Sequence, residues 1–163
     1  MTIGDFADVA VKGSFPLVFV VFNTLFALLS QEEQLRCFQN VARRLTPEGV
    51  FLIGAFVPDV ARFARGQSTQ ASQVATDHVM LDVSRHDPLS QRIIGSHVWI
   101  TDGGVKLYPV HLRYVWPSEM DLMARLAGLR LRDRWGGWRQ EPFMADSARH
   151  VSVYERAGQA LHP

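Results

Sequence analysis

Two short runs without a polar side chain, separated by one helical segment, constrain the fold of this chain most strongly. Residues 17–22 (LVFVVF) and 50–56 (VFLIGAF) lack the alternation of polar and apolar residues that marks a strand with one solvent-exposed face. Each is therefore typical of a strand buried on both faces. Between them, Ser30 and Glu33 have the spacing of a capping box, and apolar residues recur every three or four positions as far as Leu45. The pattern predicts two parallel strands joined by a helix.

The apolar period changes to two beyond residue 79. Apolar and aromatic residues occupy positions 108, 110, 112, 114 and 116, and the turn sequence Asp102-Gly103-Gly104 joins this run to residues 93–100. We therefore expect an antiparallel insertion of about three strands over residues 79–116, with Pro109 at an edge or a bulge. The polar segment 60–77 is expected to form a short helix and a loop.

The last third of the chain repeats the helix and strand signals. Ser118 and Asp121 have capping-box spacing before a helix that ends at Gly128, and strand candidates follow at residues 129–135 and 150–155. We expect one α/β domain over residues 1–163: an incomplete doubly wound, Rossmann-like sheet with an antiparallel β insertion.

Composition excludes several classes of protein. The net charge of +1 gives no electrostatic reason to expect nucleic acid as a partner. The apolar stretch at 15–29 is shorter than the roughly 20 residues of a spanning helix, so we expect no membrane partner. A single cysteine, Cys37, excludes an internal disulfide and a cysteine-based zinc site, and it falls off the apolar stripe of its helix, so we expect it to be inert. A cytoplasmic protein is the default expectation.

The sequence contains no glycine-rich turn of the kind that opens a nucleotide site. Such a turn lies between a strand and the N-terminus of a helix, where the backbone approaches the ligand. The glycine pairs Gly103-Gly104 and Gly136-Gly137 do not open a helix after an apolar run.

Several segments together nevertheless resemble class I S-adenosylmethionine-dependent methyltransferases, in particular the small-molecule and sugar N-methyltransferases. The segments that carry the resemblance are GDFAD at 4–8, FPLVFVVFNTLFAL at 15–28, ARRLTPEG at 42–49, VFLIGAFVPD at 50–59, WPSEMDLMARLAGL at 116–129 and SVYER at 152–156. They cover most of the chain in the family's order. The resemblance implies that this chain corresponds to the C-terminal two-thirds of the fold and lacks the N-terminal glycine-rich part that holds the cofactor.

The resemblance also assigns cofactor-binding residues. Asp5 would bind the adenine amino group and Phe6 would lie against the adenine ring, while Phe22, Asn23 and Thr24 would line the crevice at the end of the first strand. The residues alone allow other interpretations. Asp5 also fits a local Asx turn, and Asn23 and Thr24 also fit the cap of a helical turn.

Other candidate residues lie in the insertion. His97, among aromatic residues, is a candidate catalytic base for an amine nucleophile, although a partly buried structural histidine is the simpler interpretation. A two-residue turn would set His97 near Val110 and direct it to the face opposite His111, so we expect no metal site. Arg113 and Tyr114 are candidate substrate contacts, although Arg113 also fits a solvated face.

Two hypotheses of function follow. In the first, the chain catalyses methyl transfer to a small-molecule substrate, with S-adenosylmethionine bound weakly or not at all until the N-terminal part is supplied. In the second, the chain is a non-catalytic binding or self-associating module. In either case, an exposed strand at 17–22 favours a homodimer or larger assembly.

Overall fold

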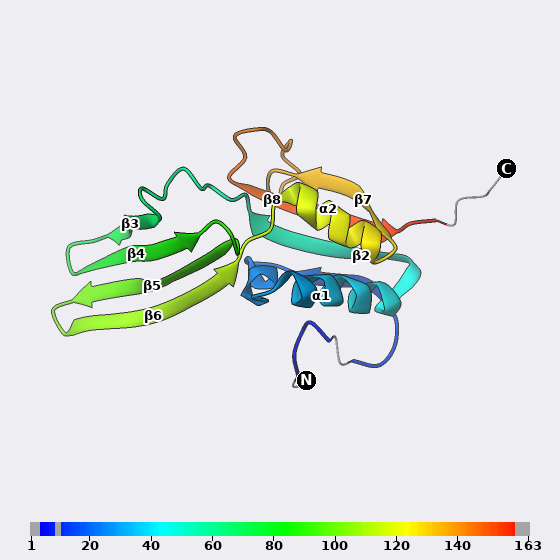
Figure 1. The fold of residues 1–163 in the computed structure, drawn as a ribbon, viewed down its shortest axis with the longest axis horizontal. Coiled ribbons are helices and arrows are strands. Elements are labelled where there is room, and N and C mark those ends of the chain that lie inside the picture. Colours follow the sequence, from blue (N-terminus) through cyan, green and yellow to red (C-terminus); the bar gives the residue numbers. More distant parts are fainter. Residues whose placement is uncertain (1–3, 9–10, 159–163) are drawn as a thin grey trace. The chain divides into compact units, whose positions relative to one another are not determined.

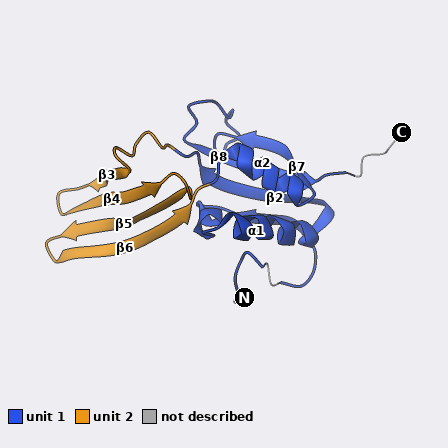
Figure 2. Ribbon diagram, viewed as in Figure 1, with its two compact units in different colours: residues 1–58, 115–163 blue, residues 59–114 orange. Residues whose placement is uncertain are grey.

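A computed structural model describes residues 4–8 and 11–158 of the chain. Contacts divide it into two compact units, each of which is described by itself (Figure 2). Unit 1 comprises residues 1–58 and 115–163, and unit 2 comprises residues 59–114. Within the described ranges, no helix has both the length and the apolar character needed to cross a bilayer.

Unit 1 is built on a four-stranded mixed sheet. Its strands, in spatial order, are β1 (Phe15–Val20), β2 (Leu45–Phe56), β8 (Arg149–Arg156) and β7 (Leu129–Trp135). β1 and β2 are parallel, whereas β8 is antiparallel to both of its neighbours. The parallel pair confirms the predicted strand–helix–strand unit.

The helix α1 (Gln31–Arg44) connects β1 to β2 through the short 3-10 turn η1 (Thr24–Ala27) and runs along β2 (Figure 1). The predicted capping box is present: Glu33 N donates to Ser30 Oγ at 3.1 Å, and Ser30 N donates to Glu33 Oε2 at 3.1 Å. Phe38, fully buried, packs edge-on against the rings of Phe51 and Tyr154. The core of unit 1 therefore lies between this helix and the sheet.

The apolar pattern of the first strand indicated burial on both faces, which was wrong, whereas the exposed strand that the sequence analysis also expected at 17–22 is observed. β1 is an edge strand, with Leu17 50% and Phe19 63% exposed. Among the residues that the structure describes, only β2 pairs with it. Burial of both faces depends on packing partners, and the described residues leave the side chains of Leu17 and Phe19 largely exposed.

The expected capping box of the second helix was also wrong. Helix α2 (Pro117–Leu126) has Trp116 at its N-cap and Pro117 in its first turn, and no side chain caps it. Proline suits this position because its fixed φ is already helical and its missing N–H costs no helical bond. Asp121 pairs with Arg134 instead, and Gly128 ends the segment at φ +76°, as expected.

Unit 2 is an antiparallel sheet whose strands follow one another in sequence. They are β3 (Gln67–Val74), β4 (His78–Asp87), β5 (Arg92–Thr101) and β6 (Gly104–Arg113). β3 replaces the helix and loop expected over residues 60–77, because a mostly exposed strand needs no apolar face. Pro109 lies in β6 at the edge of the sheet, as expected.

Candidate functional site

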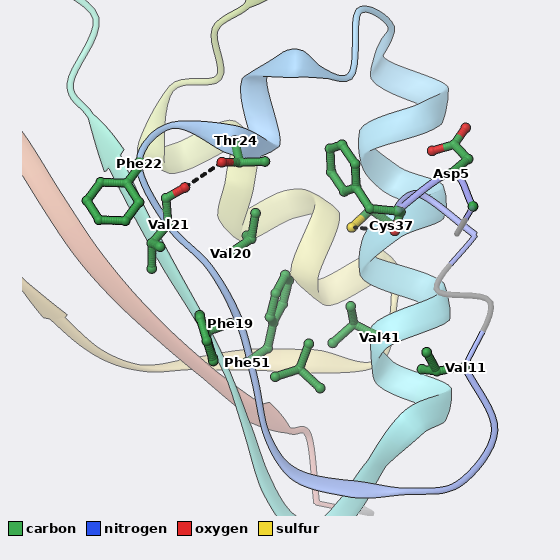
Figure 3. Close-up of a pocket in the computed structure, with 13 residues that line it drawn as sticks. Asp5, Val11, Phe19, Val20, Val21, Phe22, Thr24, Cys37, Val41 and Phe51 are labelled. Atoms are coloured by element: carbon green, nitrogen blue, oxygen red, sulfur yellow. Dashed lines mark hydrogen bonds between the residues drawn. The ribbon is translucent and has the colours of Figure 1, made fainter. Parts of the chain in front are cut away.

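A pocket of about 470 Å³ lies beside β1, between this strand, α1 and the N-terminal segment (Figure 3). Four of the five residues that the resemblance assigns to the cofactor line it: Asp5, Phe6, Phe22 and Thr24. Asp5 and Phe22 stand at opposite ends, with Cys37 and Phe51 between them (Figure 3). Apart from a few groups near the ends, the lining is apolar, as is common in ligand pockets.

Asp5 has the turn geometry of the local interpretation and also borders this pocket. Its Oδ1 accepts a hydrogen bond from Ala7 N at 2.8 Å, which closes an Asx turn. Its Oδ2 lies 3.6 Å from the guanidinium of Arg36, which forms a closer pair with Asp8 at 2.9 Å. The Asp5 side chain is 47% exposed, so the turn leaves part of the carboxylate accessible to a ligand.

The carboxyl end of β1 turns sharply at two residues with left-handed backbone. Phe22 has φ +57° and Asn23 has φ +63°, and a bulky residue such as phenylalanine rarely adopts this conformation. Asn23 Oδ1 accepts from Phe56 N at 2.8 Å, and Asn23 N donates to Gly54 O at 3.1 Å. Asn23 thus ties β1 to β2 and lines a second hollow, of about 350 Å³, rather than the pocket beside Asp5. Phe22 borders both cavities and is 86% exposed.

Cys37 lies inside the apolar face of α1, contrary to the expectation that it falls off that stripe. Only 3% of it is exposed, and its Sγ lies 3.8 Å from Phe6 O. Burial, followed by the nearby Asp5 carboxylate, raises the pKa of the thiol to about 12. A thiol that stays protonated at neutral pH is a poor nucleophile.

The other predicted residues lie in unit 2, and the structure does not bring them together. His97 on β5 stands opposite Tyr108 on β6 and contacts Asp82 on β4. The predicted pairing near Val110 was wrong by two residues, because Asp102 and Gly103 form the turn between Thr101 and Gly104. Arg113 on β6 stands opposite Arg92 on β5. Arg92 lies five positions, or about 17 Å, along β5 from His97.

Arg113 and Tyr114 are both buried, so the solvated position considered for Arg113 was wrong. An Nη of Arg113 donates to Gln91 Oε1 at 2.9 Å. The hydroxyl of Tyr114 lies 2.9 Å from Nε2 of His86. Among the described residues, no three histidine, cysteine or acidic side chains cluster as a metal site would require.

Sequence reasoning missed a buried polar network in unit 1. Arg134 Nη2 lies 2.6 Å from Asp121, whose carboxylate also accepts from the hydroxyl of Tyr154 at 2.8 Å. Arg134 Nε donates to Ser152 Oγ at 2.8 Å, and this hydroxyl lies 2.8 Å from His150 Nδ1. The signal was present in the alternation of polar and apolar residues along β8, where His150, Ser152 and Tyr154 share one face.

The buried His150 makes stability depend on pH. Burial, followed by the Arg134 charge, lowers the pKa of His150 from 6.5 to about 4 in the folded chain. Between these two values the unfolded chain binds a proton that the folded chain does not, so the free energy of unfolding falls as the pH falls. We expect His150→Asn to remove up to about 1.4 kcal/mol per pH unit of this dependence. Urea unfolding at several pH values tests this, with the exposed His111→Asn as control; equal slopes in all three proteins would contradict it.

No protein-family model matches the sequence. The chain is 28% identical over 156 residues to the cypemycin N-terminal methyltransferase of a Streptomyces species, a match covering 94% of this chain and 63% of that protein. It is 38% identical to the CcbJ methyltransferase of Streptomyces caelestis, whose structure matches with a TM-score of 0.90 over 95% of this chain and 62% of that one.

A second solved structure shows the same fold at lower identity. CalS10, an amino pentose methyltransferase from Micromonospora echinaspora solved with S-adenosylmethionine bound, matches with a TM-score of 0.63 at 18% identity, over 94% of this chain and 63% of that one. The chain therefore spans a little under two-thirds of the length of the relatives it matches. The fold predicted from the sequence, a Rossmann-like α/β sheet with an antiparallel β part, is confirmed. The resemblance to S-adenosylmethionine-dependent methyltransferases is confirmed as well: over most of its length this chain is similar to the cypemycin N-terminal methyltransferase and to the CcbJ methyltransferase.

Proposed function

We propose that this chain takes part in cytoplasmic methyl transfer from S-adenosylmethionine to a small-molecule acceptor. The observation that carries the proposal is the pocket beside β1, which gathers Asp5, Phe6, Phe22 and Thr24. Ligands of doubly wound folds bind at the carboxyl ends of parallel strands, which is where Phe22 and Thr24 lie. In this proposal residues 1–163 act as one methyltransferase-like domain, corresponding to the C-terminal two-thirds of the fold, with the antiparallel strands as its insertion.

The residues of the pocket fit part of the cofactor. Asp5 offers an acceptor for the adenine amino group, and Phe6 offers an aromatic ring beside it. Asn23 holds the turn at the end of β1 through its bonds to β2. When bound, the cofactor supplies a methyl group activated by its sulfonium. The sequence offers no glycine-rich turn that would bind the remaining part of S-adenosylmethionine. We therefore propose that the chain alone binds this cofactor weakly.

In unit 2, we propose His97 as the base that takes a proton from the acceptor. Its side chain is 49% exposed and so can be reached by a ligand. Arg113 and Tyr114 remain proposed members of the substrate region. Because both are buried and bonded to Gln91 and His86, we assign them the role of shaping that region.

Isothermal titration of the purified chain with S-adenosylmethionine tests the partial fit. We expect little or no heat of binding, since backbone amides at a helix N-terminus and a ribose-binding carboxylate normally fix such a ligand. Tight, stoichiometric binding would contradict the expected weakness.

A second candidate function is that of a non-catalytic, self-associating module. The exposed apolar edge of β1 favours it, because a strand whose outer edge pairs with no described strand, and whose Leu17 and Phe19 are exposed, can pair with a second copy. Self-association is compatible with either function. Methyl transfer by any assembly that contains the chain would decide for the first.

A further inference from the structure

Three side chains form a row across the sheet of unit 2. Asp82 on β4 stands directly opposite His97 on β5, which stands directly opposite Tyr108 on β6. Residues directly opposite one another in antiparallel strands project to the same face. Oδ1 of Asp82 contacts Nδ1 of His97, and the two side chains are 40% and 49% exposed. The row joins residues that lie 15 and 11 positions apart in the sequence.

The contact with Asp82 selects one form of the His97 ring. An ionised carboxylate only accepts hydrogen bonds, so the imidazole nitrogen that faces it carries the proton. In the neutral ring the other nitrogen, Nε2, then has a free lone pair. The half-exposed position of His97 leaves the ring accessible to a ligand.

We propose that Asp82 is the positioning residue of His97: it holds the proton on Nδ1 so that Nε2 accepts the proton of an amine substrate. This inference rests on the proposed function. As the acceptor nitrogen forms its bond to the methyl carbon, the bond from that carbon to sulfur breaks and leaves a neutral thioether. The proton of the methylated nitrogen passes to Nε2, and the resulting imidazolium is paired with the Asp82 carboxylate.

The same sheet contains a matched control. Nδ1 of His78 lies 2.8 Å from Oδ1 of Asp77, which is the same pairing on the first residue of β4. The His78 side chain is only 17% exposed, its Nε2 is buried with no partner among the described residues, and its ring stacks on Trp99. The Asp77–His78 pair therefore makes the same kind of contact as Asp82 and His97, but its imidazole ring is less accessible to a substrate.

Nitrogen-15 NMR of the histidine rings tests the inference on the chain itself. We expect unprotonated Nε2 in the neutral ring of His97. In Asp82→Asn the side-chain amide can donate to Nδ1, which moves the ring proton to Nε2. Asp77→Asn should leave the His97 spectrum unchanged. A protonated Nε2 in the neutral His97 ring of the unaltered chain would overturn the inference. So would a His97 tautomer that is the same in Asp82→Asn as in the unaltered chain.

Kinetics give a second, independent readout. In an assembly that transfers methyl groups, Asp82→Asn and His97→Gln should each lower the rate about a hundredfold, the usual scale of a general base. The double variant should be no slower than His97→Gln, because the two residues act as a unit. Asp77→Asn should keep the full rate. A full rate for Asp82→Asn, or additive losses in the double variant, would overturn the inference.

Failure of the proposed function would be recognised separately. If no assembly transfers methyl groups, the reaction of Nε2 with diethyl pyrocarbonate replaces the kinetic readout, because this reagent acylates the unprotonated imidazole nitrogen. Asp82→Asn must then slow the acylation of His97, and Asp77→Asn must not. Equal acylation rates in all three proteins would overturn the role of Asp82 whatever the function of the chain.

Discussion

The unaltered chain is expected to sediment as a homodimer or larger assembly at micromolar concentration, and the Phe19→Lys variant as a monomer. β1 pairs with β2 along one edge and with no other described strand, and Leu17 and Phe19 are 50% and 63% exposed. Leaving each such side chain in water costs on the order of 1.5–3 kcal/mol, a large share of the stability of a small domain. Pairing with a second copy through residues 17–22 would cover these side chains and satisfy the free edge.

A charge on β1 should abolish this assembly, because a lysine at position 19 would have to be desolvated between the two copies. Leu122→Lys is the matched control, since Leu122 is 51% exposed but lies on α2. Sedimentation velocity over a range of concentrations distinguishes the three proteins. A monomeric unaltered chain, or a Phe19→Lys variant that still assembles, would contradict the proposed interface.

Local signals predicted the parts of the fold that depend on a few neighbouring residues. The Ser30–Glu33 capping box set the start of α1, and the strand predicted at 129–135 is β7 itself. β3 escaped prediction because its sequence is polar and its exposed faces leave no apolar alternation to detect. The start of α2 was misjudged because Pro117 suits the first turn better than Ser118 suits the cap.

The candidate site was predictable where the chain itself brings its residues together. Phe22 and Thr24 border the pocket because they follow the carboxyl end of a parallel strand, and the resemblance placed Asp5 there. Asp82 could not be associated with His97 from the sequence, since only the register of β4 and β5 sets them side by side. The burial of His150 was overlooked because the network around it reaches Arg134 on a different strand, β7, through the hydroxyl of Ser152.

Restoration of methyl transfer by complementation has the largest expected effect. The chain spans 62% of the Streptomyces caelestis relative, so we expect co-expression with the part of that protein that it does not match to give an active assembly. In that assembly Asp5→Ala should abolish methyl transfer, since it removes the proposed adenine acceptor from the pocket. Asp8→Ala is the control, because Asp8 shares the ion pair with Arg36 but does not line the pocket.

The most direct measurement of the central claim is therefore the transfer of a labelled methyl group from S-adenosylmethionine to a small amine. It is measured by mass spectrometry on the complemented assembly and its two variants, each with an unchanged far-ultraviolet circular dichroism spectrum. We predict transfer by the unaltered assembly and by Asp8→Ala, and none by Asp5→Ala. Equal transfer by all three would reduce Asp5 to a turn residue, and no transfer by the unaltered assembly would contradict the proposed function.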